Sequence, residues 1–281
     1  MRIKMAILIG SVVLFSVVIW LYWGNESIQT TQYEVRDLKV SKELDGVKIA
    51  QVSDLHNKAF GQNQVKLLQA LTKANPDLIV VTGDVIDARR TNMEIALTFF
   101  KEALSVAPVY YVSGNHEGRI ADYDKFEVAI AAEGVTVLSN RTEKLDINDS
   151  EIRIAGVLDP TFANNIPKSD EELTEEMLKQ LNIENDLFTV LLAHRPELFS
   201  VYVDSEVDLV FSGHAHGGQM RIPFVGGIIA PNQGFFPTYS SGMFAEKETQ
   251  MIVSRGLGNS LFPVRINNRP ELVIATLKMM E

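Results

Sequence analysis

The chain of 281 residues is long enough for one large domain with an appended segment or for two small domains, and its hydrophobic content of 46% supports a real core. Its formal net charge of −10 argues against a protein that follows nucleic-acid phosphates, because that task needs a basic face, so no nucleic-acid partner is expected. The absence of cysteine excludes disulfides and thiolate metal sites.

The N-terminal segment has the length and composition of a membrane-spanning helix. Residues 5–23 carry no charge and are almost wholly apolar, and as a helix they would cross most of the hydrocarbon core of a bilayer. Three aromatic residues that suit a membrane–water interface lie at the end of this run: Trp20, Tyr22 and Trp23. Arg2 and Lys4 precede the run and mark its other end as cytoplasmic.

A cleaved signal peptide is the alternative explanation of this segment. No small-x-small cleavage site follows, and the apolar run is longer than the usual core of a signal peptide, so we favour an uncleaved single-pass anchor. The expected organisation is a cytoplasmic end and anchor at residues 1–24, a polar linker at 25–31 and one domain at 32–281. The basic residues before the span then place this domain outside the cytoplasm, at the cell membrane.

Strands and helices alternate in the first half of the domain. Short segments at residues 33–35 and 38–40 favour an edge strand or ribbon, and apolar β-branched runs predict buried strands at 47–52, 78–82 and 109–112. Helical patterns occupy residues 64–74, stopped by Pro76; 93–106, behind a Thr91-x-x-Glu94 capping box; and 123–133, ended by Gly134. This alternation predicts a mostly parallel sheet.

The second half contains more strands than helices. Strands are expected at residues 151–155, 190–192, 207–211, 250–254 and 272–277. Helices are expected at 169–181, opened by a Ser169-x-x-Glu172 capping box, and at 196–203. We infer two packed sheets that share one core, with helices outside and no second domain boundary.

Every histidine of the chain lies in a short polar segment directly after one of the apolar runs. The chain has five: His56, His116, His194, His214 and His216. The glycine-flanked pair His214 and His216, which an extended backbone would send to one side, is by itself explained equally well as a polar turn. Side chains at the carboxyl ends of strands in an α/β sheet converge on one crevice, however, so the strand endings predict one shared site.

These polar segments offer seven candidate metal ligands: Asp54, His56, Asp84, Asn115, His194, His214 and His216. Seven groups are too many for one ion, whereas two ions that share a carboxylate divide them evenly. Imidazole and oxygen ligands without sulfur suit Mn²⁺, Fe or Zn²⁺ better than Ca²⁺. A pair of such ions clamps the attacking and leaving oxygens of an in-line displacement and generates hydroxide near neutral pH, which is the chemistry of phosphoester hydrolysis.

Five blocks in this order resemble the signature of the calcineurin-like metallophosphoesterases: Asp54-x-His56, Gly83-Asp84, Gly114-Asn115-His116-Glu117, His194 and Gly213-His214-x-His216. Further stretches at residues 217–224, 253–258 and 269–271 are similar to the membrane-anchored bacterial phosphodiesterase branch of that family. The resemblance implies an α/β domain that is a four-layer αββα sandwich of two mixed β-sheets flanked by helices, here preceded by the N-terminal transmembrane helix, with a dimetal site at the sheet edges.

The resemblance also implies individual roles. It assigns one divalent ion to Asp54, His56, Asp84 and His216, and the other to Asp84, Asn115, His194 and His214. Asp84 would bridge the two ions, and His116 would protonate the leaving alkoxide or stabilise charge on the phosphoryl group. The sequence departs from the commoner pattern at Glu117, where Asp is usual, and at Ala215, where Thr is frequent.

The expected function is a membrane-anchored phosphoesterase that acts on phosphodiesters or pyrophosphates rather than on simple monoesters. The resemblance suggests generic phosphodiesters, or a nucleotide-linked glycolipid such as the lipid A precursor UDP-diacylglucosamine, as substrate. Two alternatives are a metal-binding interaction module that has lost catalysis and a nuclease of the same superfamily. The complete ligand set counts against the first, and the acidic charge counts against the second.

Three other features receive weaker interpretations. Arg255 is interpreted as a surface or salt-bridged arginine rather than a phosphate ligand, and Asp87 as the cap of a turn without a catalytic role. The aromatic residues of the loop 224–244 are expected to pack beneath their own loop, with contact to an acyl chain or a lipid surface as the alternative.

Overall fold

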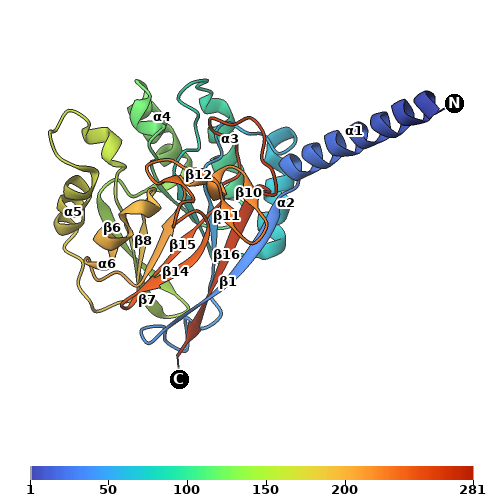
Figure 1. Cartoon of the computed structure of the whole chain (residues 1–281). Coiled ribbons are helices and arrows are strands. Elements are labelled where there is room, and N and C mark those ends of the chain that lie inside the picture. Colours follow the sequence, from blue (N-terminus) through green and yellow to red (C-terminus); the bar gives the residue numbers. More distant parts are fainter. Residues whose placement is uncertain (1, 281) are drawn as a thin grey trace.

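Two six-stranded sheets lie face to face in the computed structural model, which describes residues 2–280 (Figure 1). The first sheet contains, in spatial order, β1 (Gln29–Asp37), β16 (Glu271–Met279), β2 (Lys48–Val52), β3 (Leu78–Thr82), β4 (Val109–Val112) and β5 (Thr136–Val137). The second contains β14 (Gly242–Glu246), β15 (Thr249–Val253), β9 (Leu209–Ser212), β8 (Thr189–Leu192), β7 (Ser150–Gly156) and β6 (Arg141–Ile147).

Helices cover the outer face of each sheet. Those on the first sheet are α2 (Val65–Ala74), α3 (Met93–Ala103) and α4 (Tyr123–Glu133), and those on the second are α5 (Asp170–Gln180) and α6 (Phe199–Val203). Between the sheets lies a buried apolar layer to which both contribute, with Ile49 and Val80 on one side and Ile154 and Phe211 on the other. The expected four-layer αββα sandwich of two mixed sheets is confirmed.

The strand directions bring the site-bearing loops to one edge. The first sheet pairs β2, β3 and β4 in parallel, and the second pairs β7, β8 and β9 in parallel. Within these two sheets, the antiparallel pairs are β16 with β2, β6 with β7 and β14 with β15, so both sheets are mixed. Because parallel strands end at the same edge of a sheet, the loops that follow them meet there.

Short elements complete the connections between the sheets and helices. Two small hairpins are formed by β10 (Arg221–Ile222) with β11 (Gly226–Gly227) and by β12 (Ile229–Ala230) with β13 (Gly234–Phe235). Single 3-10 turns occupy η1 (Gln62–Gln64), η2 (Glu117–Arg119), η3 (Pro160–Ala163), η4 (Pro196–Leu198) and η5 (His216–Gly218).

The N-terminal helix α1 (Arg2–Glu26) projects away from the domain, and it is long and apolar enough to cross a membrane (Figure 1). None of its span is buried in the domain. The polar tether expected at residues 24–31 is shorter than anticipated, because α1 continues to Glu26 and β1 already begins at Gln29. Pairing of β1 with β16 orders residues that look like linker in the sequence.

Other local expectations were wrong. Residues 38–40 form a turn rather than a strand, and the helix at Met93 is capped by Asn92, whose side chain accepts from the backbone N–H of Glu94. The proposed Thr91 cap instead donates to the carbonyl of Ala88. By contrast, the Ser169 and Glu172 capping box of α5 is present with both of its hydrogen bonds.

Candidate metal centre

The structure brings all eight singled-out site residues together at the shared edge of the two sheets. Asp54 and His56 follow β2, Asp84 follows β3, and Asn115 and His116 follow β4. The second sheet supplies three imidazoles from the loops after β8 and β9: His194, His214 and His216. All eight side chains are buried, with exposed fractions of 6% or less.

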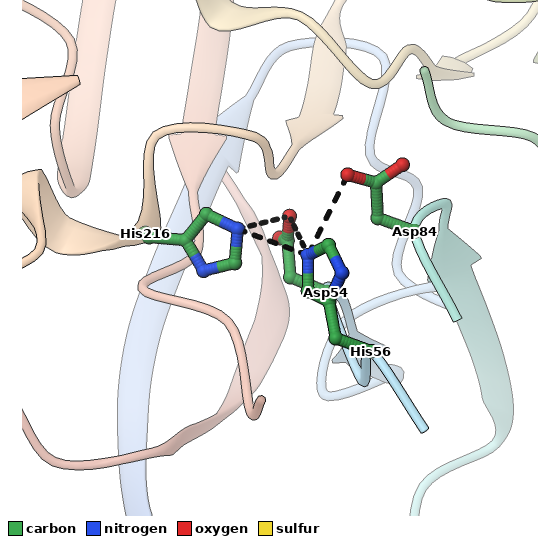
Figure 2. A group of neighbouring side chains, drawn as sticks. All are labelled: Asp54, His56, Asp84 and His216. Carbon is green, nitrogen blue, oxygen red and sulfur yellow. Dashed lines mark hydrogen bonds and ion pairs between the residues drawn. The ribbon is translucent and has the colours of Figure 1, made fainter. Parts of the chain in front are cut away.

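Four of these residues form a first group around His56 (Figure 2). Its Nε2 atom lies 3.1 Å from Nε2 of His216 and 3.5 Å from Oδ2 of Asp84. Nε2 of His216 lies 3.3 Å from Oδ1 of Asp54. Figure 2 shows the two rings and the Asp54 carboxylate pointing toward one another, with Asp84 on the side of His56.

A second group lies on the other side of Asp84. Nε2 of His194 is 3.2 Å from Oδ1 of Asn115 and 3.2 Å from Nδ1 of His214. It is also 3.4 Å from Oδ2 of Asp84. Since the same oxygen is 3.5 Å from His56 in the first group, a single carboxylate oxygen borders both groups.

These separations fit ligands around metal ions. Donors bound at ~2.1 Å in a tetrahedral arrangement lie ~3.4 Å apart, and the observed spacing between donor atoms is of this size. Two imidazole nitrogens at 3.1 Å, such as those of His56 and His216, can both be lone-pair donors only if a cation lies between them. Each group also combines nitrogen with oxygen donors and lacks sulfur, as Mn²⁺, Fe and Zn²⁺ sites do. The residues present therefore fit a pair of divalent metals.

Burial sets the charges of the imidazoles. It lowers the pKa of His56 and that of His214 to about 3, and it lowers the pKa of His216 as well, so these rings are neutral and have a lone pair to offer. For His194, burial also favours the neutral ring, but the carboxylate of Asp84 outweighs it and raises the pKa to about 10. The buried carboxylates of Asp84 and Asp54 thus require a positive charge in this cluster. A metal ion would supply it in place of the proton on His194.

The loops that carry the ligands have an unusual backbone. Five of the seven candidate ligands have positive φ values: Asp54 (51°), His56 (45°), Asp84 (51°), His214 (63°) and His216 (48°). A non-glycine residue in this region is strained, and such strain gathers at functional sites. It also explains why the alternation argument for the last two histidines was wrong, since their backbone is not extended and each ring belongs to a different group.

Two glycines let the loops approach one another. A Cβ atom on Gly213 would lie 2.0 Å from Oγ of Ser53, and one on Gly114 would lie 2.3 Å from Oδ1 of Asp84. No side chain fits in either space. Gly213 therefore serves close packing between the loops of the two sheets, and Gly114 serves it between the loops after β3 and β4.

His116 lies beside the first group without joining it. Its ring meets the ring of His56 edge-on with the centroids 4.6 Å apart. The backbone N–H of Ala88 donates to Nδ1 of His116 over 3.1 Å, so Nε2 is the nitrogen that carries the proton in the neutral ring. Burial lowers the pKa of this residue and keeps the ring neutral at rest.

Asp87 caps its turn, as interpreted from sequence, by accepting from the backbone N–H of Arg89 at 2.9 Å, and it also lies beside His116. Its Oδ1 atom lies 3.5 Å from Nδ1 of His116, and its carboxylate also accepts from both Nε and Nη2 of Arg89. When the His116 ring carries a second proton, this carboxylate can therefore accept a hydrogen bond from Nδ1–H. The signal in the sequence was its place three residues after Asp84, in the same loop.

Two glutamates support the ligands, the buried Glu117 and the partly buried Glu197. Glu117 accepts hydrogen bonds from the backbone N–H groups of Asp84, Ile86 and Gly114, at 2.8, 3.0 and 2.8 Å. It thereby ties the loop after β3 to the loop after β4. Glu197 places Oε1 3.7 Å from Nε2 of His214, on the side of the ring away from the second group, where it can orient that ring.

The interpretations of Arg255 and of the aromatic loop 224–244 are confirmed only in part. Arg255 is ion-paired to Glu271 at 2.7 Å, as expected for a salt-bridged arginine. In the loop 224–244, Tyr239 packs against Phe199 and Phe244, as expected. Phe224, Phe235 and Phe236 do not pack beneath the loop, since their exposed fractions are 110%, 72% and 64%.

A cavity of about 560 Å³ opens onto the metal centre. Asp84, Asn115, His116, His214 and His216 form its floor. Its walls include two exposed arginines from the loops after β3 and β4 and an exposed leucine from the loop before β16: Arg89, Arg119 and Leu261. A ligand in this cavity would contact both candidate metal groups and His116.

The two-sheet fold and its paired carboxylate and imidazole groups define a metal-dependent phosphoester hydrolase. The model of the calcineurin-like phosphoesterase family matches residues 47–218, and the chain belongs to this family. It is 32% identical over 262 residues to the uncharacterized metallophosphoesterase YkuE of Bacillus subtilis, covering 92% of this chain and 88% of that protein.

Two further comparisons agree with this assignment. The chain is 28% identical over 239 residues to the phosphodiesterase YaeI of Escherichia coli, covering 82% of each chain. Its fold resembles the crystal structure of TT1561 of Thermus thermophilus with a TM-score of 0.52 and 14% identity, over 75% of this chain and 90% of that one.

Proposed function

We propose that this chain is a two-metal phosphodiesterase, cleaving phosphodiester or pyrophosphate bonds. The observation that carries the proposal is the position of Asp84 Oδ2, 3.5 Å from a nitrogen of one ligand group and 3.4 Å from a nitrogen of the other. A carboxylate in this place can bridge two ions. Bound ions of this kind supply a hydroxide near neutral pH and neutralise charge on the phosphoryl oxygens.

The ligand roles follow from the two groups. We assign one ion to Asp54, His56, Asp84 and His216, and the other to Asp84, Asn115, His194 and His214. The donor chemistry favours Mn²⁺, Zn²⁺ or Fe for both positions. Glu117 and Glu197 touch no ion in this assignment and act by holding the loop backbone and the His214 ring.

His116 is the catalytic residue of the proposal. Its neutral ring presents Nε2–H to the cavity, where it can donate a hydrogen bond to a phosphoryl or leaving oxygen. A phosphate beside the ring favours a second proton, and Asp87 is placed to accept the resulting Nδ1–H. The ring can then transfer the Nε2 proton to the leaving alkoxide.

A diester preference is supported by the cavity and by one relative. A second ester group needs space beyond the phosphoryl group, and the walls bearing Arg89, Arg119 and Leu261 provide it. The related protein of Escherichia coli is a named phosphodiesterase. For these reasons we propose phosphodiesters and pyrophosphates as substrates ahead of monoesters.

Anchoring of the domain to a membrane by α1 is the second part of the proposal. No residue of the helix is buried in the domain, and Arg2 and Lys4 at its start favour an extracytoplasmic domain. Leu261 lines the cavity and is 75% exposed, and its neighbour Phe262 is 40% exposed. An apolar wall at the mouth of a polar site suits a lipid-linked phosphoester, of which UDP-diacylglucosamine is one example.

The test combines elemental analysis with a substrate panel. The full chain in detergent is expected to retain two divalent ions and to cleave bis(p-nitrophenyl) phosphate faster than p-nitrophenyl phosphate, with Mn²⁺ or Zn²⁺ added. UDP-diacylglucosamine and a short-chain analogue complete the panel. A protein that binds one ion, or that prefers the monoester, would contradict the proposal.

A further inference from the structure

A second cavity, separate from the metal centre, lies where α1 meets the domain. Its volume is about 190 Å³. Two tryptophans of α1 and three arginines of the domain line it: Trp20, Trp23, Arg255, Arg265 and Arg269. The guanidinium carbon of Arg269 lies 4.6 Å from the centre of the Trp23 ring.

The arginines of this cavity outnumber its acids. Arg255 is neutralised by Glu271, but no carboxylate of residues 2–280 lies within 4.0 Å of the guanidinium of Arg265 or Arg269. Arg265 donates to the carbonyls of Arg255 and Gly258 and to the side chain of Asn259, and its Nη2 lies 3.4 Å from Nδ1 of His216 at the edge of the metal centre.

Arg269 likewise donates only to neutral groups, the carbonyls of Ser27 and Ile28 and the hydroxyl of Ser27. Arg265 is only 3% exposed, so a guanidinium without an ion-paired carboxylate is almost fully buried beside this cavity. A cationic cavity of this kind favours an anion, and the planar fork of arginine matches a phosphate group.

The position of the cavity indicates the source of that anion. Only Ser27 and Ile28 separate α1 from β1, so the domain cannot move far from the end of the helix. The end is fixed further by Asn25, which accepts from the backbone N–H of Arg265 at 2.8 Å, and by an ion pair between Glu26 and Lys58 at 3.2 Å. Tryptophans at the end of a membrane span lie at the level of the lipid headgroups.

We propose that this cavity binds the phosphate-bearing headgroup of an anionic lipid in the membrane leaflet that faces the domain. Arg269 and Arg265 would neutralise the phosphate, and the rings of Trp20 and Trp23 would pack against the glycerol and the upper acyl chain. The inference rests on the membrane anchoring proposed above. It adds a lipid site that is distinct from the catalytic cavity.

The two tryptophans give a direct readout, since they are the only ones in the chain and both line the cavity. The full chain is placed in nanodiscs of three parts phosphatidylcholine to one part phosphatidylglycerol. Brominated acyl chains, which quench tryptophan, are carried either by the phosphatidylglycerol or by an equal mole fraction of the phosphatidylcholine. We expect the brominated anionic lipid to quench more strongly than the brominated phosphatidylcholine, to the extent that corresponds to an about fivefold enrichment of anionic lipid at the cavity. One basic side chain near an anionic surface gives an enrichment of this size.

Three variants separate headgroup binding from other causes. Arg269→Gln should abolish the difference between the two brominated lipids, whereas Arg269→Lys, which retains the charge, should keep part of it. Arg141→Gln removes an exposed guanidinium on β6, the far edge of the second sheet, and should leave the difference unchanged. All quenching is normalised to discs of the same variant without bromine, because Arg269 contacts Trp23 directly.

Each way in which the proposal could be wrong gives a different experimental result. Equal quenching by both brominated lipids overturns the lipid site, as does a preference that millimolar inorganic phosphate removes, since the cavity would then bind free phosphate. No quenching by either lipid shows that α1 lies outside the bilayer, which overturns the anchor together with the lipid site. Hydrolysis of bis(p-nitrophenyl) phosphate in the same discs reports the metal centre independently of these outcomes.

Discussion

At the scale of single side chains, the hydrogen bond from Ala88 to Nδ1 of His116 decides how that ring can act. The neutral ring has Nε2–H to donate, and proton transfer requires the doubly protonated form with Asp87 as partner. His116→Ala should therefore lower kcat by about 10²–10⁴-fold while the metal content stays unchanged, because the ring belongs to neither ligand group. Steady-state kinetics and elemental analysis on one preparation measure both.

A comparison of leaving groups distinguishes the two roles of His116. If the ring transfers a proton, the loss in His116→Ala is larger for an alkyl ester than for a p-nitrophenyl ester, which leaves without protonation. Asp84→Ala is the contrasting variant and should lose metal along with activity. Full turnover of both esters by His116→Ala would remove this residue from the mechanism.

Glu117 supports a prediction about the loop backbone. Its two carboxylate oxygens accept from three backbone N–H groups, so Glu117→Gln places an amide N–H₂ against donors and breaks at least one bond. We expect a loss of about 1–3 kcal/mol in the free energy of unfolding and weaker metal binding, because Asp84 lies on the tied loop. Urea unfolding and metal titration test this, with the exposed Glu133→Gln as a control that should change neither.

The ligands could be predicted from sequence because each directly follows an apolar strand, and strand ends converge in this class of fold. The contacts that Asp87 and Glu117 make in the site could not be predicted from the sequence. Both depend on which loop each side chain reaches, and the contacts between the loops after β3 and β4 arise only when the strands pair. The alternation argument put His214 and His216 on one side and failed because both have positive φ values, whereas the family resemblance assigned them to different ions.

At the scale of elements, a buried ion pair joins the segments after β7 and β8. Arg195 binds both carboxylate oxygens of Asp159 at 2.8 Å, and Asp159 is 2% exposed. Burial alone would raise the pKa of Asp159, but the hydrogen bonds and charge of Arg195 outweigh it and hold the pKa below its usual value of 3.8. A carboxyl with a lowered folded-state pKa adds stability above its unfolded pKa, and this is lost as pH falls through the folded value.

Asp159→Asn should accordingly destabilise the protein by about 3–5 kcal/mol at pH 7, since it removes the buried partner of Arg195 and leaves this charge paired only with the partly exposed carboxylate of Asp170. The difference from the unchanged protein should shrink as the pH falls through 3.8, the pKa at which half of the Asp159 side chains are protonated in the unfolded chain. Chemical unfolding of both proteins at a series of pH values measures this difference in the free energy of unfolding. A difference that vanishes already between pH 5 and 7 would show that the carboxylate is not held by Arg195.

Among the elements, the central strands were predictable and the edge strand β1 was predicted in part, whereas the edge strands β6 and β14 were not. β3, β8 and β9 are buried along their whole length and appear in the sequence as continuous apolar runs. The edge strands β6 and β14 contain no fully buried residue, so their sequences carry no apolar signal. Pairing with β7 and β15 forms them, which is a tertiary effect.

At the scale of the whole molecule, α1 and the domain meet through few contacts, so the two should be separable. A chain of residues 24–281 keeps Asn25 and its hydrogen bonds to Arg265. It should be soluble, bind metal and cleave bis(p-nitrophenyl) phosphate as the full chain does, while it no longer floats with lipid vesicles. Persistent flotation would show that exposed apolar residues such as Phe224 and Leu261 bind the membrane without α1.

Metal removal should weaken the whole fold, because the ligands come from both sheets and the centre joins them at one edge. Without cations, the protonated His194 is the main positive charge that compensates the buried carboxylates of Asp54 and Asp84. A metal ion present at about 100 times its Kd stabilises the folded state by ~2.7 kcal/mol, and chelation removes this stabilisation. For a domain of this size, such a loss lowers Tm by about 5–10 °C. Calorimetry before and after chelation measures the shift, and Asp84→Ala, which lacks the bridging carboxylate, should show almost none. An unchanged Tm in the chelated protein would mean that the two sheets hold the cluster together without help from metal.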